Sequence, residues 1–117
     1  MALKITNENI NDLMVCALEG GINYWCGKVR ITKFPKDDSE DENIIASDVI
    51  SRGGELTVYD AESNDKWILT KEKFLKGIEK TMDWGNFESI EDLIDNHDAE
   101  TADVLLQYAL FDDIVFG

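Results

Sequence analysis

The C-terminal part of this 117-residue sequence has no positively charged side chain. No lysine or arginine follows Lys80, whereas ten of the 25 acidic residues lie in 83–117. The whole chain carries a formal net charge of −14. Because such a charge repels both nucleic-acid phosphates and anionic lipid surfaces, we expect no direct binding to nucleic acid and no attachment to a membrane.

The sequence is also poor in cysteine and proline, with two cysteines and one proline, and it has no apolar run long enough to cross a bilayer. Two cysteines exclude a disulfide scaffold, so we expect Cys16 and Cys26 to be small buried thiols in a reducing compartment. A Cys16–Cys26 bridge is the alternative. The first residues become polar too early for a signal peptide, which favours a cytoplasmic protein.

No pattern of residues predicts catalysis or metal binding. The acidic segments that begin at Asp37 and Asp60 lack the glycine that the sixth position of a calcium-binding loop requires. One histidine and two cysteines ten residues apart give no zinc ligand set. Because no phosphate-binding glycine motif occurs and no nucleophile is spaced to pair with His97, we expect no catalytic residue, no metal and no cofactor.

Length and composition predict a single domain over residues 1–117, with enough apolar residues (44%) to form a core. Apolar residues at helical spacing predict helices, and alternation predicts strands. The expected helices span about 7–19, 44–51, 71–81, 89–96 and 99–110, and the expected strands span 28–34, 55–60 and 66–70. This order indicates an α+β fold, in which the hairpin at 55–70 and the strand at 28–34 form a small antiparallel sheet packed with four to five helices.

The segments between these elements carry further expectations. The acidic residues of 36–43 predict a mobile loop, because they cannot bury enough apolar surface to become ordered. Ile45 and Val49 are expected to point inward from the short helix. A loop at 83–88 is expected to carry Trp84 and Phe87, and the apolar residues of 114–117 to dock on the core.

The acidic residues of 83–113 predict a surface for a positively charged partner. Like charges repel one another in the folded chain, and a basic surface would relieve that repulsion and speed association. We expect the carboxylates to form one contiguous face, with two aromatic side chains as apolar anchors. A solvated face and a cation site are the alternatives. The predicted partner-binding residues are Asp92, Asp95, Asp98, Glu100, Asp103, Trp84 and Phe87.

Four stretches carry a resemblance to a known group of proteins: ALEGGINYWC (17–26), SRGGELTVYDAE (51–62), LTKEKFLKGIE (69–79) and DAETADVLLQYALFDDIVFG (98–117). They resemble small acidic proteins of bacteriophages and mobile elements of Gram-positive bacteria, over most of the chain outside the acidic insert near 36–43. The resemblance implies a phage or mobile-element origin and action inside the bacterial host cell. Small acidic phage proteins often occupy the nucleic-acid groove of a host protein.

Charge and resemblance together favour an interaction protein that is not an enzyme. In this hypothesis it is an inhibitor that mimics the charge of nucleic acid and binds a basic host protein, such as a defence nuclease. One alternative is an accessory protein that binds a small molecule or nucleotide in a pocket near Tyr59 and Trp67. Another is a self-associating phage accessory protein, and the sequence leaves the oligomeric state and the partner's identity open.

Overall fold

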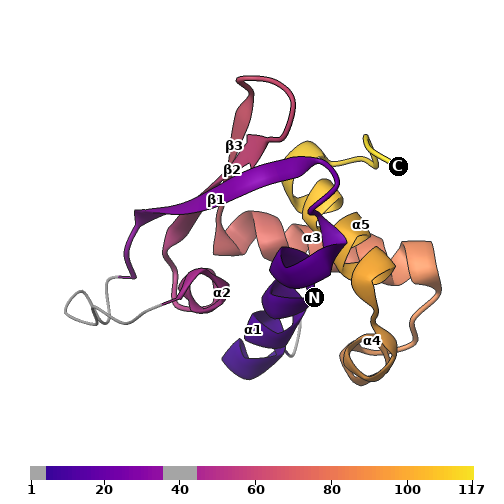
Figure 1. Ribbon diagram of the computed structural model, residues 1–117. Coiled ribbons are helices and arrows are strands. Elements are labelled where there is room, and N and C mark those ends of the chain that lie inside the picture. The colour runs from indigo at the N-terminus through magenta and orange to yellow at the C-terminus, as the bar shows by residue number, and fades with distance from the viewer. Residues whose placement is uncertain (1–4, 36–44) are drawn as a thin grey trace.

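The chain forms a three-stranded antiparallel sheet with helices packed on one of its faces, as the computed structural model of residues 5–35 and 45–117 shows (Figure 1). The strand order is β1-β2-β3. This arrangement confirms the α+β prediction, including the hairpin and the third strand. The predicted mobile loop at 36–43 lies outside the described residues.

The sheet separates an apolar face from a polar one, as strand alternation requires. Val29 pairs with Val58, and Ile31 with Leu56, on the face that packs against the helices. The hairpin turn is closed by the Asp60 carboxylate, which accepts hydrogen bonds from the backbone N–H groups that follow it at residues 62 and 63. The strands are β1 (Cys26–Lys33), β2 (Glu55–Asp60) and β3 (Lys66–Leu69).

The helices begin where the sequence offers an N-cap. The side chains of Thr6, Thr70, Ser89 and Asp98 each accept a hydrogen bond from a backbone N–H three residues ahead. Within the described residues, no helix is long and apolar enough to cross a membrane. The α-helices are α1 (Asn7–Cys16), α2 (Ala46–Val49), α3 (Lys71–Gly85), α4 (Ile90–Asn96) and α5 (Ala99–Phe111), and a π-helical turn, η1 (Ala17–Gly21), follows α1.

Two local predictions are wrong. Trp84 lies on the last turn of α3 and not in a loop, because the helix continues to Gly85 before Asn86 adopts the left-handed conformation (φ 55°) that ends it. Ile45 is 58% exposed and does not point inward, because α2 begins only at Ala46 and Ile45 precedes it in an extended conformation. Val49, on the same short helix, is buried as predicted.

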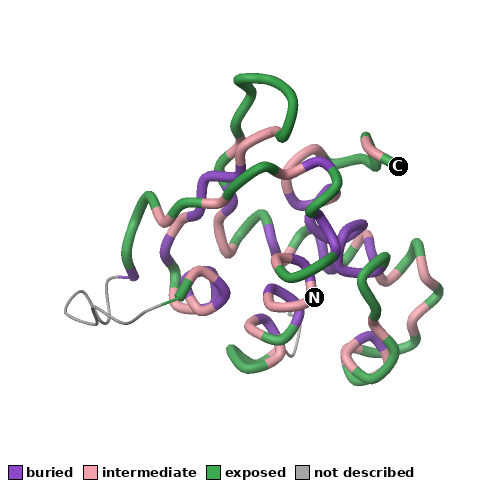
Figure 2. Tube along the Cα trace, viewed as in Figure 1, coloured by how far each residue is buried: buried purple, intermediate pink, exposed green. Residues whose placement is uncertain are grey.

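Helix α5 lies at the centre of the core (Figure 2). Every residue from 101 to 107 is buried, and α5 packs along α3, which contributes Phe74 and Ile78. Beside it, the rings of Trp25, Trp67, Phe111 and Phe116 form an aromatic cluster. The Phe116 ring stacks on Trp25 with centroids 5.0 Å apart, so the final segment does dock on the core through this side chain.

Both cysteines are free thiols, and each is half-buried. Loss of solvent contact is the main cause that raises the pKa of the Cys16 thiol and of the Cys26 thiol above its ordinary value. The structure therefore agrees with the expectation of two thiols and contains no Cys16–Cys26 bridge.

Candidate functional site

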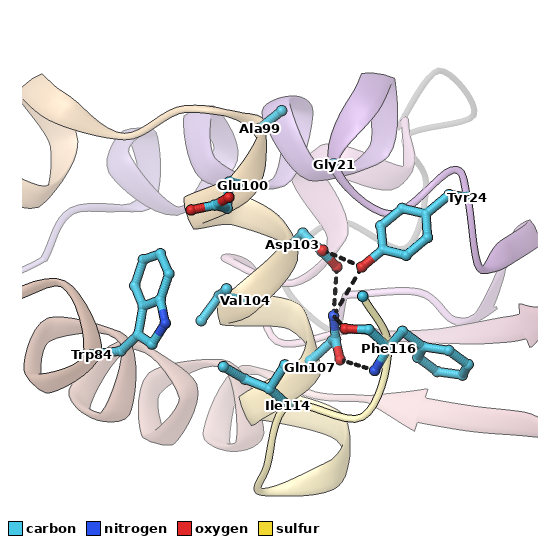
Figure 3. Close-up of a pocket in the computed structure, with 11 residues that line it drawn as sticks. Gly21, Tyr24, Trp84, Ala99, Glu100, Asp103, Val104, Gln107, Ile114 and Phe116 are labelled. Carbon is cyan, nitrogen blue, oxygen red and sulfur yellow. Dashed lines mark hydrogen bonds between the residues drawn. The ribbon is translucent and has the colours of Figure 1, made fainter.

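An open groove of about 550 Å³ runs along one side of α5 (Figure 3). Its floor follows one helical stripe, at positions 100, 103, 104 and 107, and its walls come from the chain before β1, the end of α3 and the C-terminal segment. The residues that line it are Gly21, Tyr24, Trp84, Ala99, Glu100, Asp103, Val104, Gln107, Ile114, Phe116 and Gly117.

The start of α5 is positioned by a cap and by a close backbone contact. Asp98 caps the helix by accepting hydrogen bonds from the N–H and the hydroxyl of Thr101, and these bonds lower the pKa of its carboxyl group. Gly21 packs so closely on this turn that a Cβ atom would lie 2.9 Å from the Ala99 carbonyl oxygen. The π-helical turn η1 thus holds the N-terminal wall of the groove directly against α5.

Asp103 forms the polar centre of the groove. It is only 8% exposed, and its carboxylate accepts hydrogen bonds from the Tyr24 hydroxyl (2.5 Å), Trp25 Nε1 (2.7 Å) and Gln107 Nε2 (2.9 Å) (Figure 3). The first two donors lie almost eighty residues away in the sequence. The bonds therefore tie α5 to the chain that enters β1, and their three donors are all electrically neutral.

Gln107 holds the C-terminal segment in place. Its Oε1 accepts hydrogen bonds from the backbone N–H groups of Val115 and Phe116, both at 2.7 Å, and its Nε2 donates to the Phe116 carbonyl oxygen (3.3 Å). Because Gln107 is fully buried and also donates to Asp103, one continuous network joins the floor of the groove to its C-terminal wall.

The network makes Tyr24 hard to ionise. Loss of solvent around its hydroxyl and, second, the hydrogen bond to Asp103 raise the pKa of Tyr24 from 10.0 to about 12. The fold thus favours the neutral phenol, so this contribution to stability is complete below pH 10 and is lost as the pH rises through about 12.

The measurement is the difference in tyrosinate absorbance between the wild type and Tyr24→Phe. We expect this difference to rise near pH 12, as a single phenol ionises. Asp103→Asn should move this titration part of the way back, because it removes the negative charge that disfavours the tyrosinate. A Tyr24 phenol that ionises at the ordinary value of 10.0 in the folded protein would contradict the hydrogen-bonded geometry.

The rim of the groove is exposed and amphipathic. Tyr24 is 55% exposed, Trp84 38% and Ile114 39%, and these three are among the most exposed large apolar side chains of the described residues. Glu100 is exposed beside them, and no lysine or arginine lines the groove. Aromatic and apolar groups at a rim around a closely packed floor are typical of interaction surfaces.

The structure removes one predicted residue from the anionic surface. Asp103 was expected to present its carboxylate to a partner, but the carboxylate is buried and occupied by three donors. Asp98 and Asp92 remain at the surface and also stabilise helix ends: Asp92 accepts from the Glu88 N–H (3.0 Å) and from the Asn96 amide (2.7 Å). The Asp95 side chain is exposed and makes no hydrogen bond or ion pair with another described residue.

Only one of the two predicted aromatic anchors lines the groove. Trp84 lines the groove from the end of α3, whereas Phe87 is half-buried, packs against the core and shields the backbone of Gly85.

The side chains of Tyr59 and Trp67, near which a pocket was predicted, also lie apart. They occupy neighbouring positions on β2 and β3 but face opposite sides of the sheet. Tyr59 lies in a hollow with Lys28 and Lys66, and Trp67 does not line that hollow.

The C-terminal acids form two groups and not one contiguous face. Asp92, Asp95, Asp98 and Glu100 lie on α4 and the start of α5, whereas Asp112 and Asp113 follow the far end of α5. In the second group, the Asp112 carboxylate forms an ion pair with Lys80. The Lys80 ammonium also donates to the backbone carbonyl oxygen of Asp112 (3.0 Å). Trp84 lies between the groups, since it lines both the groove and a second hollow that contains Asp83, Asp112 and Asp113.

Sequence reasoning did not identify Tyr24, Gln107 or Ile114 as site residues. One signal was available for the network: Asp103 stands in the apolar run TADVLL (101–106), where an acid on a buried helical stripe requires hydrogen-bond donors. Residues 5–35 and 45–117 contain no group of three or more His, Cys, Asp or Glu side chains that could hold a metal ion.

Comparisons with known proteins add no relative: no family model, no curated protein and no solved structure matches the chain.

Proposed function

We propose that this protein is a non-enzymatic interaction protein that binds a basic partner through the groove and the neighbouring carboxylates of α4 and α5. In the phage or mobile-element setting that the sequence resembles, the partner is a nucleic-acid-binding host protein, such as a defence nuclease. The carboxylates occupy the surface that would otherwise hold phosphates, so the protein acts as an inhibitor that mimics nucleic acid.

One observation carries the proposal. Glu91, Asp95 and Glu100 are exposed on α4 and the first turn of α5, and none of their side chains makes a hydrogen bond or ion pair with another described residue. Glu100 lines the groove, whose rim is aromatic and whose lining has no cation, and Glu91 and Asp95 lie on the helix that precedes α5. No positive side chain of the described residues pairs with these carboxylates, and the groove beside Glu100 has exposed apolar groups. This arrangement supports a site that binds a positively charged surface.

The experiment compares two triple variants that have the same net charge. Glu91→Lys/Asp95→Lys/Glu100→Lys reverses charges at the proposed site, and Asp12→Lys/Asp65→Lys/Glu79→Lys reverses three exposed acids that do not line the groove. Each protein is used to capture partners from a Gram-positive host lysate at low and high salt. We expect the wild type and the second triple variant to retain a basic partner at low salt, and the first to lose it by at least about tenfold.

Two controls complete the comparison. Thermal stability should change little in either triple variant, because relief of repulsion offsets new cations near helix N-termini. DNA should compete with the wild-type protein for the captured partner. The proposal is wrong if both triple variants lose the partner equally, which would show a net-charge effect, or if neither does.

A further inference from the structure

The groove contains negative charge that its own residues orient but do not cancel. Asp103 is held by Tyr24, Trp25 and Gln107, all neutral donors, and both of its oxygens accept hydrogen bonds. Glu100 stands at the rim, and its side chain makes no hydrogen bond or ion pair with a described residue. The buried carboxylate therefore contributes a fixed electric field to the groove, and the exposed one is free to bind a donor directly.

Aromatic rings form two walls of the same groove. Figure 3 shows Trp84 on one side of α5 and Tyr24 on the other, with Glu100 on the side of Trp84. The face of an indole ring attracts a cation, most strongly where part of the surrounding water is displaced. Val104 and Ile114 add apolar surface that suits the aliphatic stem of a long basic side chain.

We infer that the groove receives an arginine side chain of the basic partner, with the guanidinium between Trp84 and Glu100. The inference rests on the proposed function and names the group that its partner inserts. Arginine fits better than lysine, because a planar guanidinium stacks on an indole ring while it donates two hydrogen bonds to one carboxylate. Asp103 then acts as a positioning residue that attracts the cation without binding it directly.

The test uses blocked hexapeptides in which glycine alternates with arginine, lysine or citrulline. Binding is measured by calorimetry and by tryptophan fluorescence at low salt, with Trp84→Phe assigning the signal of Trp84. We expect the arginine peptide to change the Trp84 signal and to bind at least about threefold more tightly than the lysine peptide. The citrulline peptide, which is planar but neutral, should show no measurable binding.

A matched pair of variants separates the groove from the general acidic surface. Glu100→Gln and Glu8→Gln each remove one charge from an exposed glutamate in the first turn of a helix, but only Glu100 lines the groove. Glu100→Gln should weaken binding of the arginine peptide about tenfold, and Glu8→Gln less than about twofold.

Equal weakening by the two variants, an unchanged Trp84 signal, or failure of the arginine peptide to bind the wild type would overturn the inference. None of these results removes the proposed function, which fails only if the two triple variants behave alike in lysate capture. Melting curves of each single variant show whether a loss of binding comes from loss of the fold.

Discussion

Replacing Asp103 by alanine is expected to destabilise the protein by about 3 kcal/mol, which corresponds to a melting temperature about 10 °C lower for a domain of this size. The change leaves the Trp25 N–H and one Gln107 N–H without their acceptor, and both side chains are buried. A buried donor without a partner costs about 1–3 kcal/mol. The Tyr24 hydroxyl, on an exposed side chain, can bond to water instead.

Asp103→Asn provides the informative control. Its amide oxygen can still accept from Trp25 and Gln107, and its amide nitrogen can donate to the Tyr24 hydroxyl, which is both a donor and an acceptor. We therefore expect the free energy of unfolding of this variant, measured with urea, to lie within about 1 kcal/mol of the wild-type value. Asp95→Ala, at an exposed position, should change stability by less than about 0.5 kcal/mol. A similar loss for all three variants would contradict the hydrogen-bond network.

Replacing Gly77 by leucine is expected to destabilise the protein by about 3 kcal/mol or more. Gly77 lies where α3 crosses α5, and a Cβ atom there would be 2.8 Å from the Leu105 carbonyl oxygen and 3.0 Å from the Ala109 backbone nitrogen. These are backbone atoms of a buried helix, so they cannot move aside as a flexible side chain would. Any side chain at this position must therefore push the two helices apart.

The matched control for this prediction is Gly20, where a Cβ atom would have no neighbour within 4 Å. Gly77→Ala should cost about 1–2 kcal/mol, since better helix propensity offsets part of the overpacking. Gly20→Ala should be neutral or stabilising by about 0.4–1 kcal/mol, because it reduces the entropy of the unfolded chain. If alanine is tolerated equally at both positions in thermal melts, α3 and α5 are not packed as closely as the structure shows.

The secondary structure was largely predictable because its signals are local. Thr70 and Ser89 cap helices at the positions that their neighbours predict, and the turn AESND joins two strands of the expected hairpin. The wrong predictions fall at element ends. There the position of a helix boundary depends on small differences in free energy, as at Trp84, where α3 gains a further turn before Asn86 stops it.

The candidate site was only partly predictable, because its residues come from segments that are far apart in the chain. The sequence indicated an acidic C-terminal part and identified Trp84 and Glu100, which both line the groove. It did not indicate Tyr24, which reaches the groove only because Gly21 lets η1 pack against α5. It also placed Asp103 on the surface, since charge alone does not show which side of a helix faces the core.

The sequence by itself determined the class of fold, the first residues of most helices and the charge asymmetry, because periodicity, capping and composition act over a few residues. Only the tertiary structure decided that the acids form two groups, that Asp103 is a buried acceptor and that an aromatic groove lies over α5. These features depend on which faces pack together, and the packing is decided by contacts between segments that are distant in the sequence. The charge of a side chain can be read from the sequence, but its neighbours are set by the fold.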